Sequence, residues 1–144
     1  MTEPARRSAF FDRYGPWAVI TGASDGIGRE IARSAAERGL DTVLVARRRD
    51  RLDELARELG RAGVSTRVVD ADLGTSDGLE SVRRATEDLD VGLLAAAAGF
   101  GTSGPFLDQS LDAELAMLDV NCGAVASLAH HFGRRFVERG RGGL

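Results

Sequence analysis

All 19 basic residues of the chain are arginine, so the chain contains no lysine. Codon bias in a G+C-rich genome is the simplest cause of this use of arginine in place of lysine. A reaction that needs a lysine amine, to lower a neighbouring pKa or to form a Schiff base, cannot be carried out by this chain alone. The single cysteine, Cys122, excludes an internal disulfide and a thiolate cluster for a metal, so we expect no metal site.

Long hydrophobic runs and a strong net charge are also lacking. No apolar run approaches the roughly 18 residues that a membrane span requires. The first residues, with Glu3, Arg6, Arg7 and Asp12, lack the apolar stretch of a signal peptide. A formal charge of -3 gives no support for a general attraction to nucleic acid or anionic lipid. We therefore expect a cytoplasmic protein without nucleic-acid or membrane partners.

Glycine, in contrast, is plentiful and gathers in one informative place. Residues 21–28 read Thr-Gly-Ala-Ser-Asp-Gly-Ile-Gly, between a strand-like run at 17–20 and a helix-like run at 29–38. At a strand-to-helix turn, missing β-carbons let the backbone bend tightly and let a pyrophosphate approach it. The new helix directs its unpaired N–H groups and its positive dipole end at the phosphates. Ordinary turns also use glycine, but these flanking runs favour a nucleotide site.

Strand-like and helix-like runs alternate along the rest of the chain. The strand-like runs cover residues 17–20, 41–46, 65–69 and 91–98. Apolar residues recur at helical spacing between them, and we expect Ile27, Ile31 and Ala35 of the first helix to pack on the sheet. The alternation predicts an α/β fold, a doubly wound Rossmann-type parallel sheet in the order 3-2-1-4, ending after the fourth strand and its following helix.

One domain is expected over residues 1–144, with residues 1–15 as an N-terminal extension and without a C-terminal catalytic half. In this order the fourth strand lies at an edge of the sheet. Its unpaired N–H and C=O groups predict aggregation or edge pairing between copies. Residues 141–144 resemble the start of a fifth strand.

An unbroken apolar stripe marks the last helix. Its members are Leu111, Leu115, Leu118, Cys122, Val125, Ala129, Phe132 and Phe136. We expect this stripe to be core rather than coiled coil, with one flank available for a homo-oligomer through the 111–138 helix. Asn121 should face inward beside the stripe, where its amide must find partners and can distort the helix. His130 and His131 point about 100° apart and are expected at the surface or the rim.

With these elements in place, the chain resembles the short-chain dehydrogenase/reductase family from about Trp17 to Leu144. Thr21, Gly22, Gly26 and Gly28 match the glycine spacing of that family. The resemblance implies hydride transfer between NADP(H) and a small carbonyl or alcohol substrate. It also implies that Asp72 contacts adenine and that Asn121 supports a proton-relay water. Residues 99–106 look most like ketoacyl reductase members of the family.

The choice of cofactor can be argued from charge. The second strand ends in Arg47, Arg48 and Arg49, about 20 residues after the glycine turn, where an acidic residue would bind the ribose hydroxyls of NAD. A solvated basic surface, partly neutralised by Asp50 and Asp53, is the alternative. Cations at a helix start oppose the helix dipole, so the cluster is unfavourable without an anion. A 2′-phosphate would be that anion, which favours NADP over NAD, with Arg47 as the first contact and Arg48 as the second.

The expected site follows from these arguments and from the resemblance. The cofactor-binding residues are Thr21, Gly22, Ser24, Asp25, Gly26, Ile27, Gly28, Arg47, Arg48, Asp72, Leu73, Ala98 and Gly99. Asn121 is expected to have a supporting catalytic role.

The chain also departs from the pattern of the family. Residues 96–99 read Ala-Ala-Ala-Gly where the family usually has Asn-Asn-Ala-Gly, so amides that tie this strand to its neighbours are absent. The catalytic serine and the Tyr-x-x-x-Lys pair of the family have no counterpart, and the one tyrosine, Tyr14, precedes the first strand. We therefore expect the chain alone to be inactive. The alternative is a stand-alone nucleotide-binding or interaction module without catalysis.

Overall fold

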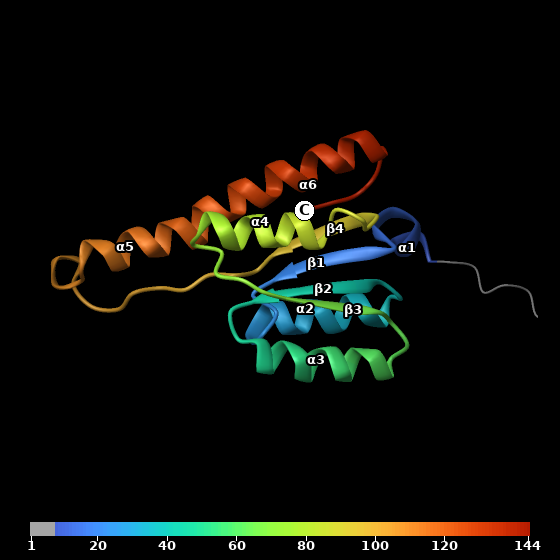
Figure 1. The fold of residues 1–144 in the computed structure, drawn as a ribbon, viewed down its shortest axis with the longest axis horizontal. Coiled ribbons are helices and arrows are strands. Elements are labelled where there is room, and N and C mark those ends of the chain that lie inside the picture. Colours follow the sequence, from blue (N-terminus) through green and yellow to red (C-terminus); the bar gives the residue numbers. More distant parts are fainter. Residues whose placement is uncertain (1–7) are drawn as a thin grey trace, which may run out of the picture.

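The computed structural model describes residues 8–144 and shows a parallel sheet between two layers of helices (Figure 1). Glu3, Arg6 and Arg7, on which the signal-peptide argument rests, lie outside the described residues. The strands are β1 (Trp17–Thr21), β2 (Asp41–Ala46), β3 (Thr66–Asp70) and β4 (Val91–Ala96). Their order is β3-β2-β1-β4 and all pairs are parallel, so the predicted fold class and strand order are confirmed.

Alternating strand residues serve two separate cores. Val19 and Val43 face one core, whereas their chain neighbours Ile20 and Leu44 face the other. Both faces of the inner strands are therefore buried, as expected for a parallel sheet with helices on each side. Helices α4 (Ser76–Ala85) and α6 (Val125–Arg139) cover the first face. Helices α2 (Gly26–Glu37) and α3 (Arg49–Arg61) cover the second, together with α1 (Ala9–Tyr14).

The buried face of α2 differs from the sequence prediction. Its buried residues are Gly28, Ala32, Ala35 and Ala36, whereas Ile27 is 77% exposed. The prediction that Ile27 packs on the sheet is therefore wrong. Small side chains face inward because the helix starts in close contact with the end of β1, and Ile27, one position before Gly28, is rotated away by about 100°.

The last helix is not one continuous α-helix. It consists of α5 (Leu111–Leu118), a π-helical segment at Asp119–Ala124, and α6. Of the stripe, only Phe132 and Phe136 are buried, and they pack in the core together with Leu128, which the stripe did not include. Cys122 of the stripe is exposed. Leu111, Leu115 and Leu118 are 66%, 47% and 51% exposed, so the prediction that they are core is wrong. The reason is visible in Figure 1, where α5 projects beyond the end of the sheet and has no strand beneath it.

The outer edge of β4 is partly covered by the end of the chain. The backbone N–H of Leu94 donates to the carbonyl of Gly143 at 3.0 Å, and the N–H of Gly143 donates to Gly92 at 3.1 Å. The bridge is parallel, which confirms that these last residues resemble the start of a fifth strand. Within residues 8–144, every helix is too short or too polar to cross a lipid bilayer.

Candidate nucleotide site

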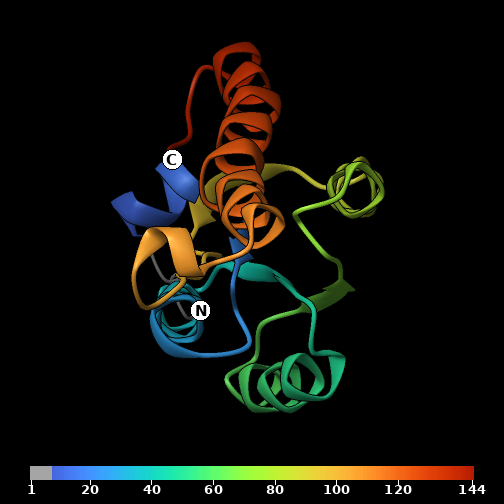
Figure 2. The same ribbon diagram turned by 90° about the vertical axis from the view of Figure 1, so that its left-hand side faces the viewer.

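A cavity of about 670 Å³ lies at the carboxyl ends of the strands, which face the viewer in Figure 2. Ligands bind at this edge in open α/β sheets, and the volume is within the range of about 300–1,000 Å³ of ligand pockets. Every residue of the expected cofactor set except Thr21 lines it. The structure therefore brings together side chains and backbone from four separate strand ends.

Two glycines of the first turn are required by close backbone contacts. Gly22 has φ +68°, and a β-carbon there would lie 2.6 Å from the carbonyl oxygen of Ala97. A β-carbon at Gly28 would lie 2.3 Å from the carbonyl oxygen of Gly22. The turn is therefore folded tightly against both the end of β4 and the start of α2, which leaves its outer surface open to the cavity.

Thr21 has a structural role beneath the cavity. Its side chain is 1% exposed, and its hydroxyl accepts a hydrogen bond from the backbone N–H of Ala98 at 3.1 Å. This bond joins the ends of β1 and β4, where the chain lacks the asparagine amides usual in the family. Thr21 itself does not line the cavity. Its hydrogen bond to Ala98 instead holds Ala98 and Gly99 at the cavity wall.

The start of α2 presents an anion-binding end to the cavity. Asp25 is the N-cap, and its Oδ1 accepts from the backbone N–H of Gly26 at 2.8 Å. A β-carbon at Gly26 would meet nothing within 4 Å, so this part of the turn is open space. The amides of the first helical turn have no intrahelical acceptors, and the dipole adds positive charge there. The arrangement suits a phosphate group.

The arginines after β2 are not equivalent. Arg47 is exposed and forms no ion pair or hydrogen bond with any described residue. Arg48 lies 3.4 Å from the Ser24 hydroxyl, and Arg49 lies 2.7 Å from Asp70 Oδ1. Intramolecular partners thus already offset part of the charge at the start of α3. Arg47 is therefore the arginine of this cluster that has no carboxylate partner among the described residues.

Asp25 connects the glycine turn to a further arginine. Its Oδ2 lies 2.9 Å from Arg51 Nη1 and 3.6 Å from Arg48 Nη2. The Gly26 N–H and then the charge of Arg51 hold the pKa of Asp25 below its usual value. Arg51 was not predicted from the sequence, although it lies in the first turn of α3, which directly follows the N-cap Arg48.

Asp72 and Leu73 form the wall of the cavity that follows β3. Asp72 Oδ1 accepts from the backbone N–H of Gly74 at 3.0 Å, which fixes the turn into α4. Thr75 caps that helix by accepting from Gly78 N–H at 3.0 Å. Asp72 is exposed and Leu73 is buried. An exposed carboxylate beside an apolar side chain is therefore available to a ligand at this end of the cavity.

Asn121 is exposed, so the prediction that it faces inward is wrong. Its Nδ2 donates to the carbonyl of Phe100 at 2.8 Å, and its Oδ1 accepts from the N–H of Phe100 at 3.0 Å. It lies within the π-helical segment, but its amide bonds to Phe100 and not to the backbone of its own helix. The side chain fastens the loop after β4 to the long helix.

Further residues that were not predicted from the sequence also line the cavity. They are Ala46, Ala71, Gly74, Thr75, Ala97, Phe100, Ala116, Asp119 and Val120. Those at 116–120 are far along the chain from the glycine turn, and no motif marks them. They reach the cavity because α5 and the start of the π-helical segment lie at the end of the sheet.

A sheet in the order 3-2-1-4, with a glycine turn beneath a cavity at its carboxyl edge, defines a Rossmann-type α/β domain. The family model described as short chain dehydrogenase matches residues 16–144, and the chain belongs to that family.

Known relatives extend beyond the part that this chain matches. The chain is 36% identical over 134 residues to the 7beta-hydroxysteroid dehydrogenase of Clostridium sardiniense, covering 92% of this chain and 51% of the relative. A solved 7beta-hydroxysteroid dehydrogenase superposes with a TM-score of 0.89 at 34% identity, covering 92% of this chain and 53% of that one. A short-chain dehydrogenase from Sphingobium yanoikuyae, solved with NADPH, has a TM-score of 0.84 at 40% identity, covering 89% and 51%. The chain thus spans about half the length of these relatives.

Proposed function

We propose that the chain is the NADP(H)-binding part of a short-chain oxidoreductase that acts on a small carbonyl or alcohol substrate. The observation that carries the proposal is Arg47, an exposed guanidinium without an ion-pair partner among residues 8–144, at the rim of the cavity. A carboxylate at the end of β2 would favour NAD, and none stands there. The NADPH bound to the similar dehydrogenase of Sphingobium yanoikuyae supports the same cofactor.

The lining residues suggest which part of the dinucleotide each would hold. The first turn of α2 would bind the diphosphate through the N–H groups of Ile27 and Gly28, because the N–H of Gly26 already donates to Asp25. Arg47 and Arg48 would bind the 2′-phosphate through their guanidinium groups. Asp72 and Leu73 would contact the adenine.

The other end of the cavity would receive the nicotinamide. Ala98 and Gly99 would contact it from the end of β4, and Ile27 would cover it from the start of α2. When bound, the nicotinamide supplies the hydride chemistry, whereas the protein binds and orients it. Asn121 would act as a positioning residue, because it holds the Phe100 loop at this end of the cavity.

Proton transfer to or from the substrate requires residues that this chain does not place at the cavity. The chain has no lysine. Its one tyrosine, Tyr14, lies near Gly92 and Gly143 at the opposite edge of the sheet. We therefore propose that the chain alone binds cofactor but does not turn over substrate. The same observation favours a second candidate, a nucleotide-binding module without catalysis.

The coding sequence beyond codon 144 distinguishes these two candidates. An in-frame extension with a serine, a Tyr-x-x-x-Lys pair and further strands supports the oxidoreductase. A stop codon at that position supports the non-catalytic module.

Titration of NADPH and NADH against the wild-type chain and Arg47→Ala tests the cofactor assignment. We expect the substitution to weaken NADPH about tenfold or more, because a charge-assisted hydrogen bond is lost, and to leave NADH within about twofold. Isothermal titration calorimetry measures both affinities. Arg61→Ala is the matched control, because Arg61 is an exposed arginine in the last turn of α3 and does not line the cavity. Equal wild-type affinity for both cofactors would overturn the assignment.

A further inference from the structure

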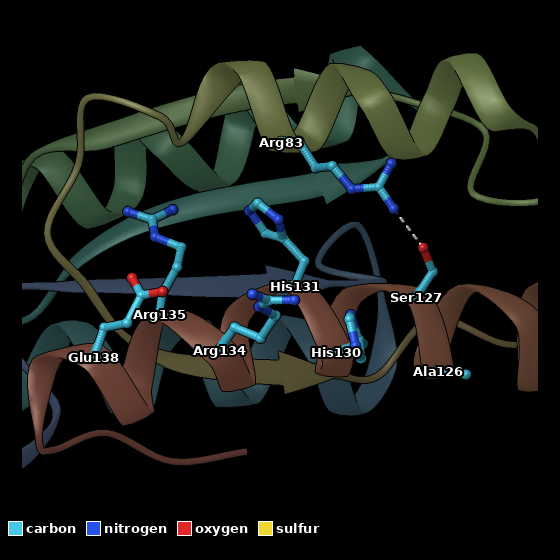
Figure 3. Close-up of a pocket in the computed structure, with 8 residues that line it drawn as sticks. All are labelled: Arg83, Ala126, Ser127, His130, His131, Arg134, Arg135 and Glu138. Carbon is cyan, nitrogen blue, oxygen red and sulfur yellow. Dashed lines mark hydrogen bonds between the residues drawn. The ribbon is translucent and has the colours of Figure 1, made fainter.

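A second basic region lies away from the nucleotide cavity, in a groove of about 540 Å³ between α4 and α6 (Figure 3). We call it the α4–α6 groove. Its polar lining includes Arg83, Ser127, His130, His131, Arg134 and Arg135. It shares no lining residue with the nucleotide cavity.

The arginines of the groove differ in how far they are already engaged. Arg135 is a structural residue, because its two terminal nitrogens donate to the carbonyls of Thr86 and Leu89 at 3.0 and 2.5 Å. Arg83 reaches across from α4 and donates to the Ser127 hydroxyl at 2.6 Å. Arg134 is exposed and has no hydrogen bond or ion pair with any of residues 8–144. Arg83 and Arg134 therefore retain N–H donors for a ligand.

His131 adds an unsatisfied polar atom to the same groove. Its side chain points from α6 towards α4 in Figure 3. Its ring packs edge-on against the ring of Phe132, with 4.8 Å between the two ring centroids. Its Nε2 is shut away from solvent and has no hydrogen-bond partner among the described residues. Buried polar atoms in native proteins are nearly always paired, so an unpaired one needs an explanation.

Charges of both signs surround His131, with four arginines and three glutamates on the two helices and the residues that follow α4. Burial lowers its pKa most, and the charges of Arg135 and Arg83 lower it further. The ionisable groups that face it are Glu80, Arg83, Arg84 and Glu87 of α4 and following residues, and His130, Arg134, Arg135 and Glu138 of α6. Glu80 is already paired with Arg83 and Arg84. Arg134 has no carboxylate partner among residues 8–144, so a negatively charged ligand would supply partners for both Arg134 and the unpaired imidazole.

We propose that the α4–α6 groove binds an oxyanion of the phosphate or sulfate type, held by Arg83 and Arg134 with the imidazole of His131 as a further donor. Guanidinium groups match the geometry of such ions and form strong charge-assisted hydrogen bonds with them. The anion is either a free ion or the phosphate group of a larger molecule. Binding strengthens as the pH falls through the pKa of His131, because the protonated ring donates from both nitrogens. The proposal is independent of the nucleotide assignment.

Sulfate is the probe for the test, because its charge does not change over the pH range in which a histidine side chain gains or loses its proton. The imidazole resonances of His131 are followed by NMR while sodium sulfate replaces sodium chloride at constant ionic strength. We expect a saturable shift, with tighter binding at pH 5 than at pH 7, because burial holds the pKa of His131 below its ordinary value of 6.5. Arg134→Ala should weaken sulfate about tenfold, whereas the control Arg61→Ala should not. An equal shift with chloride, or unchanged binding in Arg134→Ala, would overturn the proposal.

A second variant tests the histidine separately from the arginines. His131→Gln keeps a hydrogen-bond donor but cannot titrate, so sulfate binding, followed through the amide of Ser127, should persist and lose its pH dependence. Persistence of that dependence in His131→Gln would contradict the role of His131. Glucose 6-phosphate, compared with inorganic phosphate, then identifies the source. Tighter binding of the ester supports a phosphorylated small molecule, and equal binding supports the free ion.

Discussion

Gly28 illustrates how a single missing side chain positions the whole site. Its backbone lies so close to Gly22 that a β-carbon would approach the Gly22 carbonyl oxygen to 2.3 Å. That oxygen belongs to the turn itself and cannot move without moving the end of β1. The close contact explains why α2 starts directly over the strand and directs its first N–H groups at the cavity.

Replacement of Gly28 by alanine should therefore destabilise the fold. We expect Gly28→Ala to lower the free energy of unfolding by about 2–3 kcal/mol through overpacking against backbone. Gly133→Ala is the matched control, because Gly133 lies inside α6 and its β-carbon would meet nothing within 4 Å. This control should gain about 0.5–1 kcal/mol from lower backbone entropy in the unfolded chain. Urea unfolding measures both, and similar effects at the two positions would contradict the contact argument.

At the scale of elements, the π-helical segment separates two parts of one helix that have different roles. The part after it, α6, packs on the sheet through Leu128 and Phe132. The part before it, α5, extends over the nucleotide cavity, where Ala116 lines the wall. Asn121 lies in the segment between them and carries both hydrogen bonds to Phe100. The irregular turn thus coincides with the contact that places the loop after β4.

Removal of the Asn121 amide should loosen this loop. We expect Asn121→Ala to cost about 1 kcal/mol of stability, because two solvent-exposed hydrogen bonds are lost. Hydrogen exchange of the Phe100 amide should become faster in this variant. Asn121→Asp keeps the acceptor for the Phe100 N–H but not the donor, so it should retain most of the protection. Unchanged exchange of Phe100 in Asn121→Ala would refute the proposed positioning role.

At the scale of the whole molecule, apolar surface is concentrated where the sheet does not reach. Leu111, Leu115 and Leu118 are all about half exposed or more on α5, and Leu107 of the preceding loop is 90% exposed. Contiguous apolar patches of this kind mark interaction surfaces in soluble proteins. The expected homo-oligomer through residues 111–138 would therefore use α5 more than α6.

Charge placed on α5 should reduce self-association. We expect the double variant Leu115→Glu and Leu118→Glu to weaken it at least about tenfold, because two apolar side chains lose their burial. Sedimentation equilibrium over a range of concentrations measures the effect. Val137→Glu is the control, because Val137 is 82% exposed on the far part of α6. Association that persists in the double variant would point to the edge of β4 instead.

The features of this protein that were predicted correctly are those whose structure depends on residues close together in the sequence. The glycine turn and the strand order follow from local backbone chemistry and from the alternation of apolar runs. The inward orientation of Asn121 and the burial of Leu115 were predicted wrongly from helical periodicity. Periodicity shows which side chains share a helix face but not whether another element lies against that face.

The sequence alone thus determined that strands and helices alternate, that they form a parallel sheet, and that a glycine turn and arginines follow its first two strands. These features depend on the backbone freedom of particular residues and on burial patterns a few residues long. Only the tertiary structure decided that Arg51 meets Asp25, that Asn121 holds Phe100, and that α5 projects past the sheet. Such contacts join segments far apart in the chain, and their partners exist only once the sheet has brought the strand ends together.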